Sequence, residues 1–267
     1  MASTNPARGM RDFLPADVRK REYVIGVIKS VYESYGFEPL DGIDASFGKE
    51  IDEDSKSVEA NSILAINQAL DRLGIKNFAI YVSHSDVLAC VLETVGVRQK
   101  LHKHTFAAIG SFTKYNIEGF VNELQDIGVS EKASTILADL FLKTDEILNQ
   151  EHDINRTVVS NLLNIVNNET LTELGQILRL TGKTPVFIDP ALACESPYRP
   201  GIVIEARTSG LDVLGDGGCI GEKTAGTTEE DSTVFAFSFD IESIVALMEN
   251  SNAFPPAVAV SGSAAVL

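Results

Sequence analysis

The stretch RGMRDFLPADVRKREYVIGVIKSVYESYGFEPL, which runs from Arg8 to Leu40, decides the fold of this chain. It predicts a long amphipathic helix over Asp12–Ser34, because apolar residues recur at spacings of three and four, at Val24, Ile28, Val31 and Tyr35. Pro15 suits the first turn of this helix, and Gly36 can supply the left-handed residue that ends it. A strand is expected to begin within Phe37–Leu40. The chain therefore opens with a helix that leads directly into a strand.

The rest of the sequence changes from helical to strand-like periodicity. Helices are expected over Val58–Leu73, ending at Gly74, over the run that ends at Gly96, and then as far as Leu180, with one strand at Phe78–Val82. After Gly182 the period becomes two, which predicts strands at Pro185–Asp189, Gly201–Ala206 and Thr233–Phe239, followed by a helix over Ile241–Asn250. This order predicts an α+β fold, in which an antiparallel sheet is flanked by helices and carries an all-helical insert.

Composition restricts where the protein works and what it binds. The 267 residues carry a formal net charge of -16, which disfavours binding to nucleic acid. The main basic cluster is expected to be a solvent-exposed surface: Arg8, Arg11, Arg19, Lys20 and Arg21. The N-terminus has no apolar signal segment, and no apolar run is long enough to span a membrane. The three cysteines form no paired framework, so a reducing, cytoplasmic location is expected.

The Arg8–Leu40 stretch resembles the opening of histidyl-tRNA synthetases. In that family an arginine-rich block that binds ATP and the acceptor end of tRNA follows this opening. Here Leu40 is followed directly by Asp41, and the segment from Asp41 onward resembles the part of the family's sequence that comes after that block. The resemblance implies a truncated class II synthetase core, with no anticodon-binding domain. It also implies a homodimer in which the first helix carries the interface, through Arg11, Asp12, Phe13, Val24, Ile28 and Val31.

The resemblance gives a domain organisation with four parts. Residues 1–82 would form the N-terminal part of the core with its dimerisation helix, and residues 83–182 a helical insertion domain. Residues 183–250 would complete the core, and residues 251–267 would be a flexible tail.

The segment from Asp189 to Glu205 resembles the family's histidine-recognition segment. Tyr198, Gly201 and Glu205 match that pattern and are candidate remnants of a histidine pocket, although a tyrosine and a glutamate at strand ends are also common without any function. Cys194 stands where the family has an arginine that neutralises the α-phosphate. The loss of a positioned cation from a phosphate site costs orders of magnitude in rate.

Two further segments resemble family motifs that have lost their charges. The glycine-rich segment Leu214–Gly221 is expected to be a turn, and Cys219 stands where the family has an arginine. Phe237–Ile244 resembles the final signature, with Asp240 in place of a glycine and Ser243 in place of the arginine that contacts the γ-phosphate. An added carboxylate and a lost guanidinium both disfavour ATP.

The cysteines and histidines offer no strong metal site. Cys194 and Cys219 would converge on one pocket in the resembled fold, which allows a disulfide or a soft-metal site, while the simpler interpretation is two small buried thiols that fill space. His84 is expected to cap or pack at a strand end, and His102, His104 and His152 to face solvent. No metal is expected.

Three functions fit these observations. The first is a non-catalytic scaffold or regulatory protein, like the regulatory subunit of ATP phosphoribosyltransferase, with a partner enzyme, histidine as a candidate effector and no cofactor. The second is a working histidine–tRNA ligase, which would use ATP and Mg²⁺. The third is a tRNA-binding accessory protein, which the acidic balance of the chain disfavours.

Overall fold

The computed structural model describes residues 15–40, 45–51, 58–110, 117–148, 168–192, 201–210, 212–221 and 233–259. Its helices are α1 (Pro15–Ser34), α2 (Val58–Arg72), α3 (Ser85–Thr94), the 3-10 turn η2 (Gln99–Leu101), α4 (His102–Gly110), α5 (Ile117–Ile127), α6 (Glu131–Leu148), α8 (Asn168–Thr181), α9 (Ile241–Asn250) and α10 (Pro256–Ala259). Its strands are β1 (Glu38–Pro39), β2 (Ser46–Glu50), β3 (Phe78–His84), β4 (Val186–Ile188), β5 (Ile202–Thr208), β6 (Val213–Gly221) and β7 (Thr233–Phe239).

The strands form one sheet in the order β1-β2-β7-β6-β5-β3-β4. Neighbouring strands are antiparallel except at one edge, where β4 pairs with β3 in parallel. The predicted α+β fold is confirmed, but the sheet is mixed and not purely antiparallel. Two parallel strands can be neighbours only when a long crossover connects them. The segment that contains α3 to α8 joins β3 to β4 and provides this crossover.

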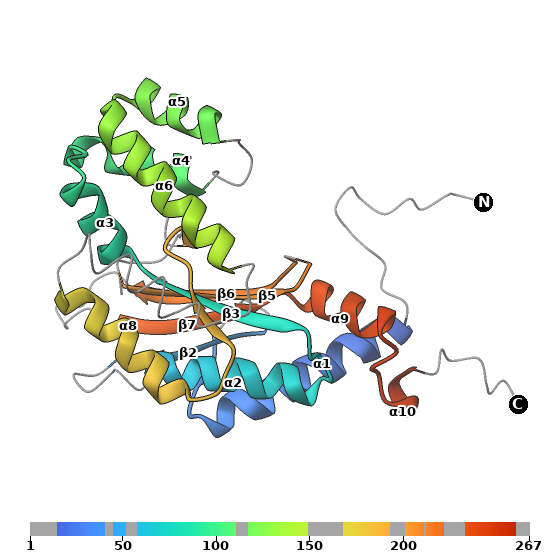
Figure 1. Cartoon of the computed structure of the whole chain (residues 1–267). Helices are drawn as coiled ribbons and strands as arrows, with labels where there is room; N and C mark the ends of the chain where they lie inside the picture. Colours follow the sequence, from blue (N-terminus) through green and yellow to red (C-terminus); the bar gives the residue numbers. More distant parts are fainter. Residues whose placement is uncertain are drawn as a thin grey trace, which may run out of the picture.

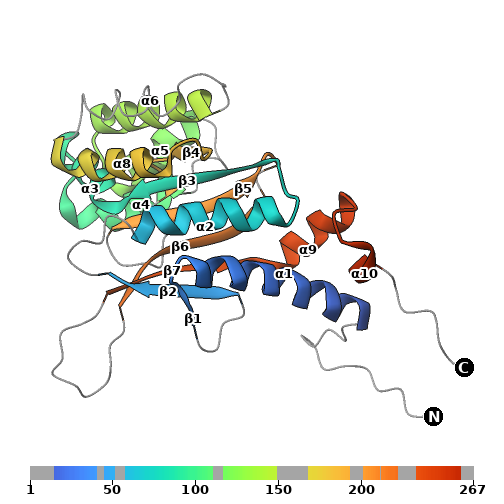
Figure 2. The same cartoon turned by 90° about the horizontal axis from the view of Figure 1, so that it is seen from below.

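Helices α1 and α2 lie side by side on one face of the sheet (Figures 1 and 2). Val24, Ile28 and Val31 of the predicted apolar stripe are buried, whereas Tyr35 lies past the end of α1 and is half-buried. Tyr32 is also buried, at the centre of an aromatic group, with ring centroids 5.2 Å from Phe37, 4.9 Å from Phe47 and 5.4 Å from Phe239. Gly36 has φ +77°, so it supplies the predicted left-handed end of the helix. The long opening helix thus closes one side of the core.

The helical insert stands on the other side of the sheet from α1 and α2 in Figure 1. Helices α4, α5 and α6 pack on one another, and α8 returns to pack against α2. Among the described helices, none combines the length and the apolar character that a membrane span requires.

Two expectations about local structure were wrong. The glycine-rich segment Leu214–Gly221 is not a turn but belongs to strand β6, because its glycines let the strand lie against the large ring of Phe237: a Cβ on Gly217 would be 2.7 Å from that ring and 2.4 Å from the carbonyl oxygen of Ala236. Part of the expected flexible tail is packed, since Phe254 is buried and its ring centroid lies 6.2 Å from that of Tyr23. Residues 260–267 lie outside the described part.

Candidate functional site

A row of polar side chains crosses the sheet on the face away from α1 and α2. Cross-strand pairing places its members directly opposite one another, in the order Tyr81, Glu205, Asp216, Ser238 and Ser46. Directly paired residues share a face of the sheet, and the next residues along each strand point to the other face. Those neighbours are apolar or glycine and are buried: Val82, Ile204, Gly217, Phe237 and Phe47. We call the first set the polar row.

Arg207 gathers the acidic groups at one end of the polar row. Its Nε donates a hydrogen bond to Oε1 of Glu205, and its Nη1 lies 3.4 Å from Oδ2 of Asp189. The guanidinium carbon lies 4.7 Å from the ring centroid of Tyr81. These side chains are largely shielded, with 22% of Arg207, 16% of Glu205 and 11% of Asp189 exposed. The cluster is therefore an ion network on an aromatic face.

The electrostatics of the cluster keep Arg207 charged. Burial lowers the pKa of Arg207, but the hydrogen bond to Glu205 and the charges of Glu205 and Asp189 outweigh that effect, so the pKa is raised overall. Burial raises the pKa of Tyr81, and the nearby guanidinium only partly offsets it. Tyr81 is thus a neutral phenol and Arg207 a fixed cation at neutral pH.

The candidate histidine-pocket residues do not all come together. Glu205 lies in the polar row, while Gly201 precedes β5 with φ +143° and donates its N–H to the hydroxyl of Ser85 at 2.8 Å. Tyr198 lies outside the described residues, as does Cys194. The structure therefore places Glu205 in a polar site and Gly201 at the end of the sheet.

Cys219 lies on the helix-covered face and not in the polar row. It is a buried free thiol, and burial together with the charge of Glu59 raises its pKa to about 11. Cys194 lies outside the described residues, and the simpler interpretation of Cys219 as a space-filling thiol fits its burial. Among the described residues, no group of histidine, cysteine and acidic side chains could hold a metal ion.

Asp240 and Ser243 form a helix cap at the start of α9. The carboxylate of Asp240 accepts hydrogen bonds from the backbone N–H of Ser243 at 3.1 Å and from its hydroxyl at 2.9 Å. These contacts are those of an N-cap residue, which satisfies amide groups that have no partner inside the helix. The two positions that lack the family's glycine and arginine thus stabilise a helix end.

The basic cluster at the start of the chain is partly neutralised by α9. Lys20 Nζ lies 2.5 Å from Glu249 and Arg21 pairs with Glu242, while Arg8 and Arg11 lie outside the described residues. The pairing ties α1 to the last long helix. It leaves Lys20 and Arg21 less available to a polyanion.

The expected dimer residues on α1 require a correction. Val24, Ile28 and Val31 are each 0% exposed in the single chain, so they belong to its own core and offer no surface to a second copy. Their spacing of four and three residues therefore marks the face of α1 that packs on the core of its own chain. Arg11, Asp12 and Phe13 lie outside the described residues.

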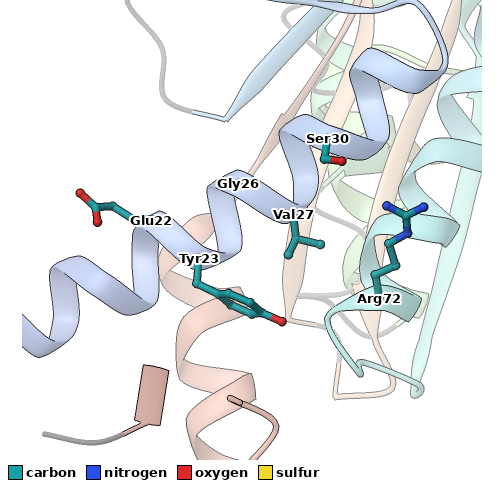
Figure 3. A pocket seen from close by; sticks show the side chains of 6 residues that line it. All are labelled: Glu22, Tyr23, Gly26, Val27, Ser30 and Arg72. Carbon is teal, nitrogen blue, oxygen red and sulfur yellow. The ribbon is translucent and has the colours of Figure 1, made fainter. Parts of the chain in front are cut away.

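The outer face of α1 is the part that another molecule could reach. It borders a hollow of about 540 Å³, lined by Glu22, Tyr23, Gly26, Val27, Ser30 and Arg72. Figure 3 shows Tyr23 and Val27 pointing into the space between α1 and Arg72 of α2. A Cβ on Gly26 would meet nothing within 4 Å, so the helix surface is open there.

Two of the described histidines, His84 and His102, have structural roles, and one expectation about the histidines was wrong. His84 caps α3, as expected from its place at a strand end, and its Nδ1 accepts the N–H of Asp86 at 3.1 Å. His102 is buried and not solvent-facing, because its Nε2 lies 3.1 Å from the carbonyl oxygen of Val97 and its ring packs near Phe106. His104 is exposed as expected, and His152 lies outside the described residues.

Sequence reasoning missed the central residue of the site, Arg207. Part of the signal was present, because Glu205 lies on the predicted strand Gly201–Ala206 and Arg207 directly follows it. Extending that strand by one residue would have put both side chains on one face. Tyr81 and Asp216 were also missed, since their approach depends on strand order and register. Only the sheet pairing reveals that these residues meet.

Comparisons with known proteins agree with the resemblance drawn from the sequence. No family model matches the chain. The histidine–tRNA ligase of Treponema denticola is 23% identical over 202 residues, which cover 73% of this chain and 45% of that protein. The chain thus spans less than half the length of this relative.

Solved structures share the fold at low sequence identity. The histidyl-tRNA synthetase of Nostoc sp. PCC 7120 matches with a TM-score of 0.72 and 15% identity, over 96% of this chain and 77% of that one. A protein from Bacillus halodurans, described as an ATP phosphoribosyltransferase regulatory subunit/histidyl-tRNA synthetase, matches with a TM-score of 0.72 and 13% identity, over 92% and 83% of the two chains. The expected synthetase-like core is therefore confirmed as a fold.

Proposed function

We propose that this histidyl-tRNA synthetase-like chain does not activate an amino acid and acts through contacts with other proteins. One observation carries the proposal: the described strands hold two basic residues apart from His84, and both are engaged within the chain. Lys49 donates to the carbonyl oxygen of Tyr35 at 3.4 Å and lies 5.9 Å from the ring centroid of Phe37, while Arg207 is held by Glu205 and Asp189. Neither is positioned to hold a triphosphate.

The charge of the polar face also supports this proposal. Three carboxylates, those of Asp189, Glu205 and Asp216, lie on or beside the polar row, and Arg207 is the one basic side chain that the described strands contribute to this face. A transferring or displaced phosphate needs fixed cations where its charge develops. Carboxylates at this density beside the one described cation disfavour a nucleotide on this face.

A pyrophosphate exchange assay with ATP and histidine tests the loss of activation. We expect the rate to stay at background, with an active histidyl-tRNA synthetase as the positive control. The double variant Asp240→Gly/Ser243→Arg restores the resembled signature at α9 and should stay inactive, because Cys194 and Cys219 still replace two other arginines. Exchange clearly above background in the unaltered chain would support the ligase instead.

We propose that the protein partner is an enzyme, and we infer its class from the similarity to the Bacillus halodurans protein. The catalytic subunit of ATP phosphoribosyltransferase is the candidate, and histidine is the candidate effector at the polar face. Co-purification of the two chains from a mixture, followed by titration with histidine, tests both parts. Complex formation without any heat from histidine at millimolar concentration would restrict the chain to an architectural role.

Self-association through the outer face of α1 is part of the same proposal. The hollow around Gly26 carries Glu22 and Arg72, which are opposite charges at its rim, so two copies can offer each other complementary surfaces. Binding to tRNA is the weaker alternative, because Lys20 and Arg21 already pair with glutamates of α9. Saturable binding in a tRNA gel shift at low salt would restore that alternative.

A further inference from the structure

The guanidinium of Arg207 lies among acidic and aromatic side chains in the way that a bound cation would. Glu205 and Asp189 supply carboxylate oxygens to its guanidinium, and the ring of Tyr81 lies 4.7 Å from the guanidinium carbon. Carboxylates recognise a guanidinium through charge-assisted hydrogen bonds, and an aromatic face attracts it through the ring quadrupole. Two acidic groups and one aromatic face are the components of a receptor for a planar cation.

The walls of this cage are held in place by contacts that do not involve Arg207. Tyr81 of β3 and Glu205 of β5 are directly paired across the sheet. Asp189 follows β4, where its backbone N–H donates to the carbonyl oxygen of Val82 at 3.0 Å and its Oδ1 accepts the N–H of Ala191, also at 3.0 Å. The backbone positions of all three residues are therefore fixed by the sheet and by a turn, and these contacts do not depend on the arginine side chain.

We propose that Tyr81, Asp189 and Glu205 form a binding cage for a guanidinium-type cation, and that Arg207 fills it as an internal ligand. In the unaltered chain the cage is closed to other cations, because Arg207 already fills it. Arg207 cannot leave by diffusion, since it lies two residues from Glu205 on the same strand, β5. The class of ligand that would replace the side chain is a small planar cation with a guanidinium head. This inference holds whether or not the chain regulates a partner enzyme, since it concerns occupancy of the cage alone.

The position of the cage allows an external cation to reach it. The Arg207 side chain is 22% exposed, so solvent reaches part of it. Removal of the side chain would take from Glu205 and Asp189 the guanidinium that both contact beside Tyr81. The loss of a charge-assisted contact by largely buried carboxylates is costly, which is the driving force for an added ligand to bind.

Chemical rescue of Arg207→Ala tests the proposal, with methylguanidinium as the probe. Calorimetry should show saturable binding at least about tenfold tighter in Arg207→Ala than in the unaltered chain. Tyrosine absorbance gives a second readout, because the chain has no tryptophan and Tyr81 lines the cage. The double variant Arg207→Ala/Glu205→Gln should lose the binding, and Arg207→Lys should keep the cage filled. Arg98→Ala, at an exposed arginine outside the sheet, is the matched control and should bind no better than the unaltered chain.

Two results would overturn the proposal. One is a folded Arg207→Ala variant, verified by circular dichroism, that binds methylguanidinium no more tightly than the unaltered chain. The other is equally tight binding by the unaltered chain, which would place the ligand elsewhere. If Arg207→Ala does not fold, Arg207→Gln takes its place, and methylguanidinium must raise the Tm of that variant but not of the unaltered chain.

Discussion

The carboxylate of Asp240 accepts two hydrogen bonds from Ser243, one from its backbone N–H at 3.1 Å and one from its hydroxyl at 2.9 Å. This pair begins α9, whose glutamates also reach Lys20 and Arg21 of α1. The pair thus stabilises the helix that fastens the end of the sheet to the opening helix.

Replacement of Asp240 by alanine should destabilise the protein by about 1 kcal/mol, because α9 would lose its N-cap. Asp240→Asn should cost much less, since an amide oxygen also accepts the Ser243 N–H. Urea unfolding at neutral pH measures both differences. Equal stability of the alanine variant and the unaltered chain would show that the cap contributes nothing.

A side chain at Gly217 should be poorly tolerated. Gly217→Ala would bring a Cβ to 2.4 Å from the Ala236 carbonyl oxygen and 2.7 Å from the Phe237 ring, so we expect a loss of at least about 1–3 kcal/mol. Gly175→Ala in α8 is the matched control, because nothing lies within 4 Å of the added Cβ there, and it should gain about 0.5–1 kcal/mol. Thermal unfolding of the pair gives the comparison, and a similar change in both variants would contradict the packing argument.

Alkaline pH should weaken the fold through Cys219. Its pKa is raised from 9.0 to about 11 in the folded chain, so between these values the unfolded thiol releases a proton that the folded one keeps. The contribution is fully present below pH 9 and is lost as pH rises through 11, at up to about 1.4 kcal/mol per pH unit. Cys219→Ala should show a shallower fall over this window in urea unfolding.

Tyr32 provides a background to that measurement. Its pKa is also raised by burial, so it gives a slope of the same sign above pH 10 in both proteins. The difference between the unaltered chain and Cys219→Ala therefore isolates the thiol. Parallel pH profiles would show that Cys219 ionises alike in the folded and unfolded chains.

Self-association should depend on the outer face of α1. Gly26→Arg places a long cation in the hollow beside Arg72 without touching the core, so we expect a folded protein whose dimer dissociates at least tenfold more readily. Sedimentation velocity at micromolar concentration compares it with Gly175→Ala. A monomeric profile for the unaltered chain would refute the dimer itself.

The periodic elements could be predicted from the sequence because local signals specify them. Thr233–Phe239 and Ile241–Asn250 lie where period and capping place them, and Gly36 ends α1 through its backbone conformation. The glycines of β6 misled the prediction, because their role is to admit the ring of Phe237 from another strand. The Arg207 cluster was missed for a related reason: Tyr81 and Asp189 meet it only through strand order.

The parallel pair of β3 and β4 also affects how the molecule can be re-engineered. Strand β3 ends at His84 and strand β4 begins at Val186, so the segment between them leaves the sheet at one strand and rejoins it at the neighbouring strand. Helix α8 follows the insert and packs along α2, and its 14 residues are long enough for a parallel crossover by themselves. Helices α4–α6 pack mainly on one another, so we expect a shortened chain that joins α3 to α8 to retain every strand pairing of the sheet.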